Sequence, residues 1–312
     1  EDIGNLFSRF SEIASQNKYA WFKIHRSSNE IVEETPNNRM VGFPYTKYMN
    51  SIMRVNQSAA LVITSAKKAR ELGIPESKWI FMYGGGCLND IWNVTDRLNL
   101  HSSPAIKKCS QAIFNAANCT QADISFFDLY SCFPSAVQIA RKEIGIPDGD
   151  NRDLTVTGGL PYYGGPGSAY VVNSIASMVS KLRENPGKFG MVTANGWFLT
   201  KHGAGVFSSN PFLGEWNQVI DSSHLQKEIE NSDHPEFIEE ANGKGLIETY
   251  TVVNSREGPT KAIIIGLLED GKRFVANTEK DENLLNKMMQ NEMLNTKGTV
   301  RFENSRNIFQ PD

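Results

Sequence analysis

The sequence predicts an α/β protein, with a layered α/β domain followed by a small β-barrel of the OB type. From Ala59 onward, short apolar runs alternate with amphipathic helical segments, which is typical of a layered α/β domain. Beyond about residue 245 the pattern changes to three strand-like segments, a helix and a fourth strand, which is the order of an OB-type barrel. The 312 residues are 40% hydrophobic and 21% charged, which excludes a disordered or collagen-like chain.

Residues 1–53 are predicted to form a helix and a loop that link to the α/β domain. Apolar residues recur there at helical spacing: Ile3, Leu6, Phe7, Phe10 and Ile13. Pro36 and Pro44 then interrupt the pattern. We expect this region to be an appendage of the following domain.

Residues 54–210 are predicted to form the α/β domain. Its expected strands are 59–65, 79–83, 124–129, 154–157 and 189–194. Its expected helices include 104–117, 135–144 and 168–182. Pro104 suits the first turn of its helix, and Cys109 lies on the apolar face of that helix. We therefore place Cys109 in the core.

Residues 211–244 are predicted to be a polar connection, and 245–312 the OB-like domain. The expected strands are 248–254, 260–268, 272–277 and 299–302. Asp270 and Gly271 form a favoured hairpin turn between the second and third of these strands. The helix 282–294 carries a stripe of Met and Leu, which predicts packing rather than cofactor binding.

Charge and cysteine usage exclude several kinds of partner. The chain has 32 Lys and Arg against 35 Asp and Glu, so it lacks the basic surface expected for nucleic acid or anionic membranes. No apolar run reaches the length of a membrane span. Four cysteines without a Cys-x-x-Cys pair indicate neither a disulfide framework nor zinc, and they favour a cytoplasmic location. The chain begins with Glu1, and we expect that it starts within a longer protein.

The first candidate site is Tyr130 with Cys132, where a strand meets the helix 135–144. A helix N-terminus can stabilise a thiolate, and a tyrosine can donate or accept a proton. The alternative is a buried thiol beside a tyrosine that covers the sheet.

The second candidate site is a glycine-rich turn that contains Gly158, Gly159, Gly164 and Gly165. Glycines allow close approach of a ligand to the backbone, and the following helix offers free N–H groups to an anion. No Gly-Lys-Ser/Thr follows, so the turn is not a phosphate-binding P-loop. The alternative is a purely structural turn.

The third candidate site contains Asn195, Gly196 and His202 after a predicted strand. A histidine there can act as an acid, a base or an oxyanion donor, or it can simply be satisfied by local backbone groups. Because ligands gather beyond the carboxyl ends of strands, we predict that Tyr130, Cys132, Gly165, Asn195 and His202 converge on one cleft.

These three segments, in this order and spacing, resemble the C-terminal half of the thiolase superfamily. Residues 128–133 fall where thiolases carry Asn-Glu-Ala-Phe, or His-Asp-Cys-Phe in the sterol-carrier-protein branch. Residues 158–166 fall where they carry a Gly-Gly stretch ending in Gly-His-Pro, and residues 193–196 where they carry Cys-x-Gly. Residues 38–61 resemble the entry to that half in thiolase-like proteins of the acetyl-CoA acetyltransferase type. Residues 248–252 are similar to a C-terminal extension of one thiolase-like branch.

The resemblance implies a coenzyme A thioester as substrate, no tightly bound cofactor, a homodimer, and association with the half that precedes this one in thiolases. Gly165 stands at the position of the thiolase histidine and Ala194 at that of the second cysteine, and neither side chain can transfer a proton. Acyl transfer would then depend on Tyr130, Cys132 and His202. The residues expected to bind the substrate are Gly158, Gly159, Gly164, Gly165, Asn195 and Gly196. The alternatives are retro-aldol cleavage of a coenzyme A thioester, and a non-catalytic binding or assembly protein.

Overall fold

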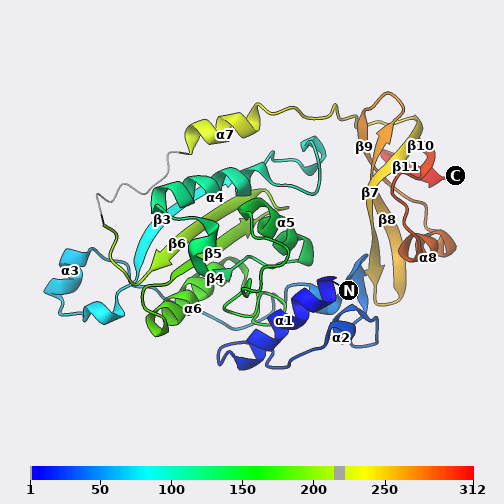
Figure 1. The fold of residues 1–312 in the computed structure, drawn as a ribbon. Helices are drawn as coiled ribbons and strands as arrows, with labels where there is room; N and C mark the ends of the chain where they lie inside the picture. Colours follow the sequence, from blue (N-terminus) through cyan, green and yellow to red (C-terminus); the bar gives the residue numbers. More distant parts are fainter. Residues whose placement is uncertain (1, 214–221) are drawn as a thin grey trace. The chain divides into compact units, whose positions relative to one another are not determined.

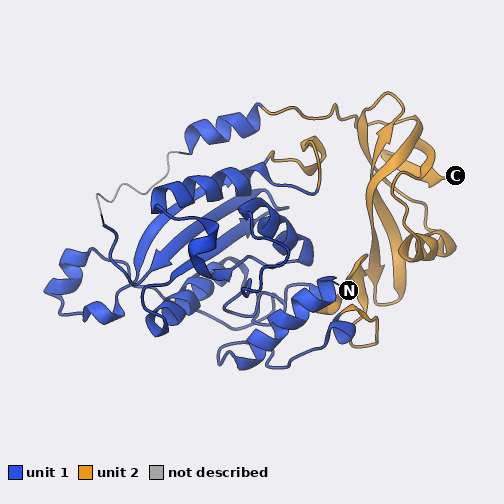
Figure 2. Cartoon of the chain, in the orientation of Figure 1, with its two compact units in different colours: residues 1–31, 49–90, 101–231 blue, residues 32–48, 91–100, 232–312 orange. Residues whose placement is uncertain are grey.

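The computed structural model describes residues 2–213 and 222–312, which form two compact units. Figure 2 shows unit 1 in blue and unit 2 in orange. Unit 1 comprises Glu1–Ile31, Met49–Asp90 and His101–Asn231. Unit 2 comprises Val32–Tyr48, Ile91–Leu100 and Ser232–Asp312. Each unit therefore draws on three stretches of chain, whereas the sequence analysis divided the chain into contiguous ranges.

Unit 1 is built on a four-stranded sheet in the order β3-β6-β5-β4 (Figure 1). Its strands are β3 (Phe81–Asn89), β4 (Ile124–Asp128), β5 (Phe189–Gly196) and β6 (Lys201–Ser208). Strands β4 and β5 are parallel, and the other two pairs are antiparallel. The carboxyl ends of β4 and β5 consequently meet at one edge of the sheet.

Helices complete unit 1 (Figure 1). They are α1 (Asp2–Gln16), α3 (Ala66–Glu71), α4 (Pro104–Ala117), α5 (Pro134–Ile144), α6 (Tyr170–Glu184) and α7 (Ser223–Glu230). Helix α4 packs against β3 and β6 with α5 beside it, and α6 packs against β4 and β5. Phe7 and Phe10 of α1 are fully buried, so this helix is part of the core and not an appendage.

Helix α4 has the predicted bounds because its local signals agree. Pro104 occupies the first turn, and the Ser103 hydroxyl accepts a hydrogen bond from the N–H of Ile106. Asn118 ends the helix in the left-handed conformation. Cys109 is buried on the apolar face, as predicted.

Two predicted strands of unit 1 are wrong, and one strand was missed. Residues 59–65 have no regular structure, and Val62 and Ile63 are 90% and 92% exposed, because an apolar run forms a strand only when it has a pairing partner. Residues 154–157 are a buried loop whose N–H groups bind a carboxylate instead of a neighbouring strand. Strand β6 was missed because its small residues, among them Gly203 and Gly205, lack a strand-like pattern.

Unit 2 contains a ring of five paired strands. They are β7 (Gly243–Ser255), β8 (Gly258–Leu268), β9 (Arg273–Asn277), β10 (Lys297–Glu303) and β11 (Arg306–Pro311). The pairing runs β7-β8-β9-β11-β10 and closes between β10 and β7, with β9 and β11 parallel. Strand β11 was not predicted. The assignment of these strands to the OB class stays a prediction.

The remaining elements of unit 2 cover the ring or extend it. Helix α8 (Glu282–Gln290) follows β9, and its Leu285 and Met288 are fully buried, so the Met and Leu stripe packs as predicted. Strands β1 (Met40–Gly42) and β2 (Tyr45–Thr46) pair at the edge of β7. The chain passes between the units within α2 (Ser28–Val32).

Membrane-spanning helices and metal-binding groups of side chains are both absent from the described part of the chain. None of its helices has the length and apolarity needed to cross a membrane. Its His, Cys, Asp and Glu side chains form no group of three that could hold a metal ion.

Candidate functional site

Tyr130, Asn195 and His202 line one small cavity in unit 1, of about 20 Å³. Tyr130 follows β4, while Asn195 and His202 are paired neighbours on β5 and β6. The backbone N–H of Tyr130 donates to the hydroxyl of Thr193 at 2.8 Å, which attaches the loop after β4 to β5. A cavity of this size accommodates about one water molecule or one ligand hydroxyl.

Cys132 joins this group through Asn195, whose amide Nδ2 donates to the thiol Sγ at 3.6 Å. The predicted stabilisation of a thiolate by the helix N-terminus is outweighed by burial. Desolvation raises the pKa of Cys132 to about 11, although hydrogen bonds from nearby backbone N–H groups and from Asn195 act in the opposite direction. The thiol is therefore protonated at neutral pH and is not an activated nucleophile.

The other amide atom of Asn195, Oδ1, is buried and has no hydrogen-bond donor among the described residues. A buried acceptor without a donor costs about 1–3 kcal/mol, so such atoms are usually satisfied by water or by a ligand. Asn195 is thus an open acceptor in the wall of the cavity.

His202 is buried and bound to Asp90, a residue that the sequence analysis missed. The ring Nε2 lies 3.0 Å from Asp90 Oδ2 and 3.1 Å from the carbonyl oxygen of Leu199. Asp90 also accepts hydrogen bonds from the Ser103 hydroxyl and from the N–H of Ala105, at 2.9 Å. This carboxylate therefore ties the end of β3 to the starts of α4 and β6. The sequence feature that could have revealed Asp90 is its position as a polar residue directly after a strand.

Asp128, at the end of β4, is a second buried carboxylate without an assigned role in the sequence analysis. Its Oδ2 accepts from the N–H groups of Val156 and Thr157, both at 2.9 Å, and from two threonine hydroxyls. Its Oδ1 accepts from the hydroxyls of Tyr170 and Ser174. Asp128 thereby fixes the loop 154–157 beside the segment that carries Tyr130.

The glycine-rich turn contacts other parts of the chain and does not line the cavity. A Cβ at Gly158 would lie 2.4 Å from that of Ala14 in α1, and a Cβ at Gly159 would lie 2.6 Å from the Phe10 ring. At Gly164 the crowding atom is Oε1 of Gln57, and the N–H of Gly165 donates to the Ile52 carbonyl. Gly196 ends β5 next to Asn195. The predicted convergence therefore holds for Tyr130, Asn195 and His202, extends to Cys132 by contact, and leaves out Gly165.

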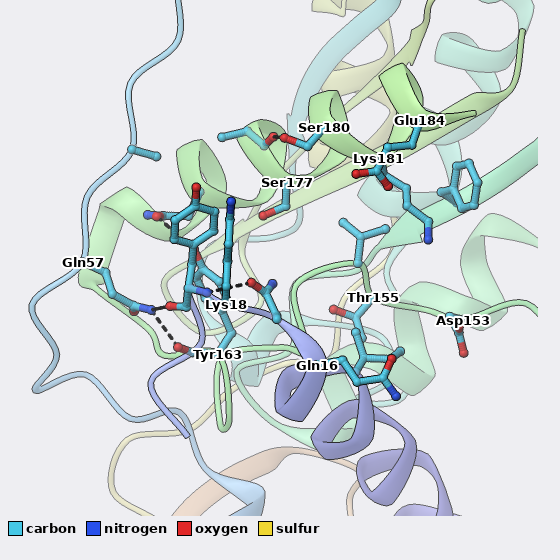
Figure 3. A pocket seen from close by; sticks show the side chains of 18 of the residues that line it. Gln16, Lys18, Gln57, Asp153, Thr155, Tyr163, Ser177, Ser180, Lys181 and Glu184 are labelled. Carbon is cyan, nitrogen blue, oxygen red and sulfur yellow. Dashed lines mark hydrogen bonds between the residues drawn. The ribbon is translucent and has the colours of Figure 1, made fainter. Parts of the chain in front are cut away.

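A larger polar cavity of about 1090 Å³ lies elsewhere in unit 1, between α1, α6 and the segments 56–60 and 151–156 (Figure 3). None of the predicted site residues lines it. Gln57 closes one side of it by donating to the carbonyl groups of Tyr19 and Tyr163.

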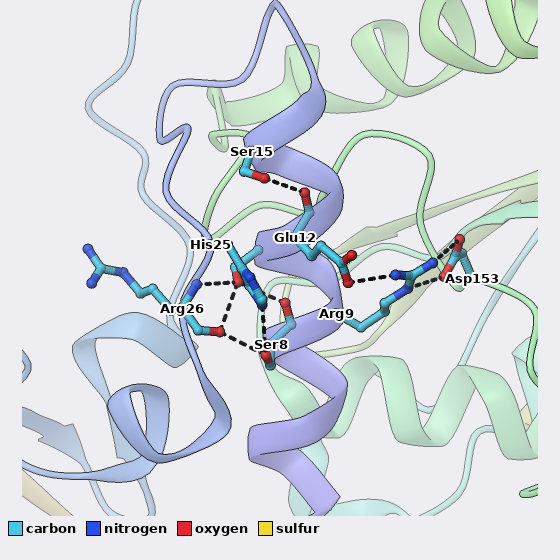
Figure 4. A network of polar contacts seen from close by, with 8 residues as sticks. Ser8, Arg9, Glu12, Ser15, His25, Arg26 and Asp153 are labelled. Atoms are coloured by element: carbon cyan, nitrogen blue, oxygen red, sulfur yellow. Dashed lines mark hydrogen bonds and ion pairs between the residues drawn. The ribbon is translucent and has the colours of Figure 1, made fainter.

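On the α1 side of this cavity, Arg9 binds Asp153 at 2.7 Å and Glu12 at 2.6 Å (Figure 4). These two carboxylates raise the pKa of Arg9. The Arg9–Asp153 ion pair connects α1 to the loop before residue 154, whereas the Arg9–Glu12 pair lies within α1.

Comparisons with known proteins agree with this fold. A family profile described as "Thiolase-like protein type 1 additional C-terminal domain" matches residues 224–305. The crystal structure of a monomeric SCP2-thiolase like protein type 1 from Mycobacterium smegmatis matches with a TM-score of 0.89 and 33% sequence identity, over 100% of this chain and 67% of that one. A search of curated proteins gave no match. The layered α/β unit is thus that of a thiolase-like protein. The chain belongs to the SCP2-thiolase-like protein family, type 1.

The homodimer prediction is wrong in the light of this comparison, since the matching protein is described as monomeric. The prediction came from the general resemblance to thiolases. Apolar surface does not by itself require a second copy, because other parts of the same chain can cover it.

Proposed function

We propose that this chain binds an acyl-coenzyme A thioester beside the Tyr130, Asn195 and His202 cavity, and that the chemistry there is aldol-type cleavage rather than Claisen thiolysis. The observation that carries the proposal is the buried Oδ1 of Asn195, which lacks a donor in a cavity that it shares with two proton-transfer side chains. A 3-hydroxyacyl group brings a hydroxyl donor to this atom. A 3-ketoacyl group brings a second acceptor and leaves Oδ1 unsatisfied.

The acyltransferase alternative requires an activated thiolate, and the geometry gives it little support. Burial keeps Cys132 protonated at neutral pH, and the positions of the thiolase histidine and second cysteine hold Gly165 and Ala194. General acid and base groups are each worth about 10²–10⁴ in rate. Losing two of them leaves thiolysis without its usual proton transfers.

Retro-aldol cleavage needs only groups that the cavity contains. A base takes the proton of the 3-hydroxyl, the C2–C3 bond breaks, and C3 becomes the carbonyl carbon of an aldehyde or ketone. The electron pair stays on C2 as the enolate of the thioester, and a proton donor then returns a proton to C2. Burial raises the pKa of Tyr130, so its hydroxyl is protonated at neutral pH and can be that donor.

Exposed aromatic residues close in sequence to Cys132 and Asn195 offer apolar surface for the acyl chain. Phe133 follows Cys132, and Trp197 and Phe198 follow Asn195 by two and three residues. All three are exposed, Trp197 and Phe198 by about two thirds of their surface. Large exposed aromatic groups often mark a binding surface.

The test is a pair of assays on the full chain, supported by calorimetric binding. One assay measures shortened acyl-coenzyme A and the carbonyl product released from a 3-hydroxyacyl-coenzyme A. The other measures cleavage of acetoacetyl-coenzyme A by free coenzyme A. We expect turnover in the first assay, its loss in Tyr130→Phe, and none in the second.

Binding tests the role of Asn195 separately. We expect Asn195→Ala to weaken binding of the 3-hydroxyacyl thioester about tenfold, the value of one hydrogen bond, and to leave the saturated acyl thioester unchanged. Asn115→Ala, at an exposed position of α4, is the matched control. Thiolysis abolished by Cys132→Ala would refute the proposed chemistry. Binding without turnover would leave a non-catalytic binder, and the absence of binding would overturn the proposal entirely.

A further inference from the structure

We infer that Asp90 and His202 act together as the base of this cavity, with His202 Nδ1 accepting the proton of a ligand hydroxyl and Asp90 as the positioning residue. The hydroxyl has a single proton, so it exchanges between two acceptors, Asn195 Oδ1 in the bound state and His202 Nδ1 when the proton is removed. The inference rests on the proposed function, because it names the group that removes the hydroxyl proton. It arises from the buried contact between the two side chains and from the other residues that line the cavity.

The hydrogen bonds of His202 determine which ring nitrogen carries the proton. Nε2 faces two oxygen atoms, Asp90 Oδ2 at 3.0 Å and the Leu199 carbonyl at 3.1 Å, and neither atom can donate. Nε2 must therefore be the N–H. In the neutral ring Nδ1 is then an acceptor, and no donor from the described residues reaches it.

The other titratable side chains that line the cavity cannot accept a proton near neutral pH. They are Cys109 from α4 and Tyr130 from the loop after β4. Burial raises the pKa of Cys109 to about 12 and also raises that of Tyr130, so both stay protonated. The lining contains no Asp, Glu, Lys or Arg. His202 is consequently the side chain there that is suited to act as a base.

Burial and hydrogen bonds hold the Asp90 carboxylate in one position, as a positioning residue requires. It is 5% exposed, and its Oδ1 accepts the N–H of Ala105, while its Oδ2 accepts both the Ser103 hydroxyl and His202 Nε2. A carboxylate in this place holds the Nε2–H tautomer and stabilises the imidazolium that forms after proton transfer.

Asp90→Asn separates this role from simple structural support. The amide oxygen can keep the hydrogen bond from Ala105, which leaves the amide NH₂ facing the Ser103 hydroxyl and His202 Nε2. The hydroxyl can rotate to accept, but two N–H groups cannot face each other. The Leu199 carbonyl oxygen is then the acceptor that remains for an Nε2–H, so the balance shifts toward the tautomer with the proton on Nδ1, and that tautomer lacks the acceptor that faces the ligand.

The experiment combines kinetics with ¹⁵N NMR of histidine-labelled full chain, with His202→Gln used to assign the signals. In the wild type we expect the Nε2–H tautomer at His202 and a shift of its Nδ1 signal when a 3-hydroxyacyl-coenzyme A binds. In Asp90→Asn we expect the Nδ1–H tautomer, no such shift, and kcat reduced about 10²-fold or more with KM within threefold. Asp148→Asn, at a fully exposed carboxylate of unit 1, is the control for removal of a charge and should behave as wild type.

Several outcomes would overturn the inference. One is the Nδ1–H tautomer in the wild type, which needs no variant to be observed. Another is an unchanged kcat in Asp90→Asn, which would show that the carboxylate neither holds the tautomer nor stabilises the imidazolium. If the wild type binds the thioester without cleaving it, the aldol proposal fails on its own, and the response of the Nδ1 signal still decides whether His202 receives the ligand hydroxyl.

Discussion

Asp128 offers the sharpest test of how the site is held in place, through the paired substitutions Asp128→Asn and Asp128→Ala. The carboxylate is fully buried and accepts six hydrogen bonds. Four of them reach Oδ2, two from backbone N–H groups and two from threonine hydroxyls. The two at Oδ1 both come from hydroxyls, those of Tyr170 and Ser174.

This division of donors predicts very different costs for the two variants. Asparagine can place its oxygen at the Oδ2 position and keep all four bonds there, while its NH₂ donates to two hydroxyls that can rotate to accept. We expect Asp128→Asn to lower the free energy of unfolding by about 1 kcal/mol, the loss of charge assistance. Alanine leaves the N–H groups of Val156 and Thr157 without an acceptor, and at about 1–3 kcal/mol each the expected cost is about 2–6 kcal/mol.

Urea unfolding followed by circular dichroism measures this difference. With a denaturant slope of about 1–3 kcal/mol/M, a loss of 3 kcal/mol moves the midpoint by about 1 M or more. Asp148→Ala is the control, because its side chain is fully exposed and should change stability by less than about 0.5 kcal/mol. Equal midpoints for the Asn and Ala variants would refute the reasoning, since they would show that the unpaired N–H groups carry no cost.

Three further predictions concern Cys132, unit 2 and the glycine turn. Because the pKa of Cys132 is about 11, only about one thiol in a thousand is ionised at pH 8. Its alkylation by iodoacetamide, followed by peptide mass spectrometry, should be slower than that of exposed Cys87 and should rise about tenfold per pH unit; a rate that levels off near pH 7 would contradict this. Arg273→Ala removes a buried guanidinium that pairs with a carboxylate at 2.6 Å and donates to two backbone carbonyls. This substitution should lower the free energy of unfolding of unit 2, measured with urea, by about 3–5 kcal/mol. A loss below about 1 kcal/mol would show that the ion pair is not needed for stability. Gly158→Ala should lower the thermal midpoint far more than Gly167→Ala, since both have positive φ but only Gly158 would clash with α1; equal effects would leave backbone strain as the sole cause.

The elements predicted well are those encoded by residues close together in sequence. Helix α4 has its cap, its proline and its apolar face within one segment, and the structure gives the predicted bounds. The hairpin of β8 and β9 was found from Asp270 and Gly271 for the same reason. Local signals suffice where the partners of each backbone group lie a few residues away.

The elements predicted wrongly depend on partners distant in sequence. Residues 154–157 have the composition of a strand, but the Asp128 carboxylate takes their N–H groups, and it lies 28 residues away from Val156. Residues 59–65 have the apolar pattern without a strand beside them among the described residues. The local sequence of these two segments therefore does not determine whether they form strands.

The sequence predicted some of the residues that line the small cavity and missed others. The rule that polar residues at strand ends share one edge brought Tyr130, Asn195 and His202 together correctly. For Cys132 the sequence left a helix-stabilised thiolate and a buried thiol open, and its burial favours the buried thiol. Asp90 went unnoticed because its partner His202 is 112 residues away.

The two buried carboxylates of unit 1 explain how the segments around this cavity are held in place. Each lies at or just after the end of a strand and binds backbone N–H groups of a distant segment, Asp128 those of Val156 and Thr157, and Asp90 that of Ala105. A buried carboxylate is stable only when several donors surround it, so each one forces its segment into a single conformation. Asp128 thereby fixes the loop 154–157 beside the segment that carries Tyr130, and Asp90 fixes His202. These anchors position the side chains of the cavity without lining it themselves, and substitutions at either anchor should alter the geometry of the cavity.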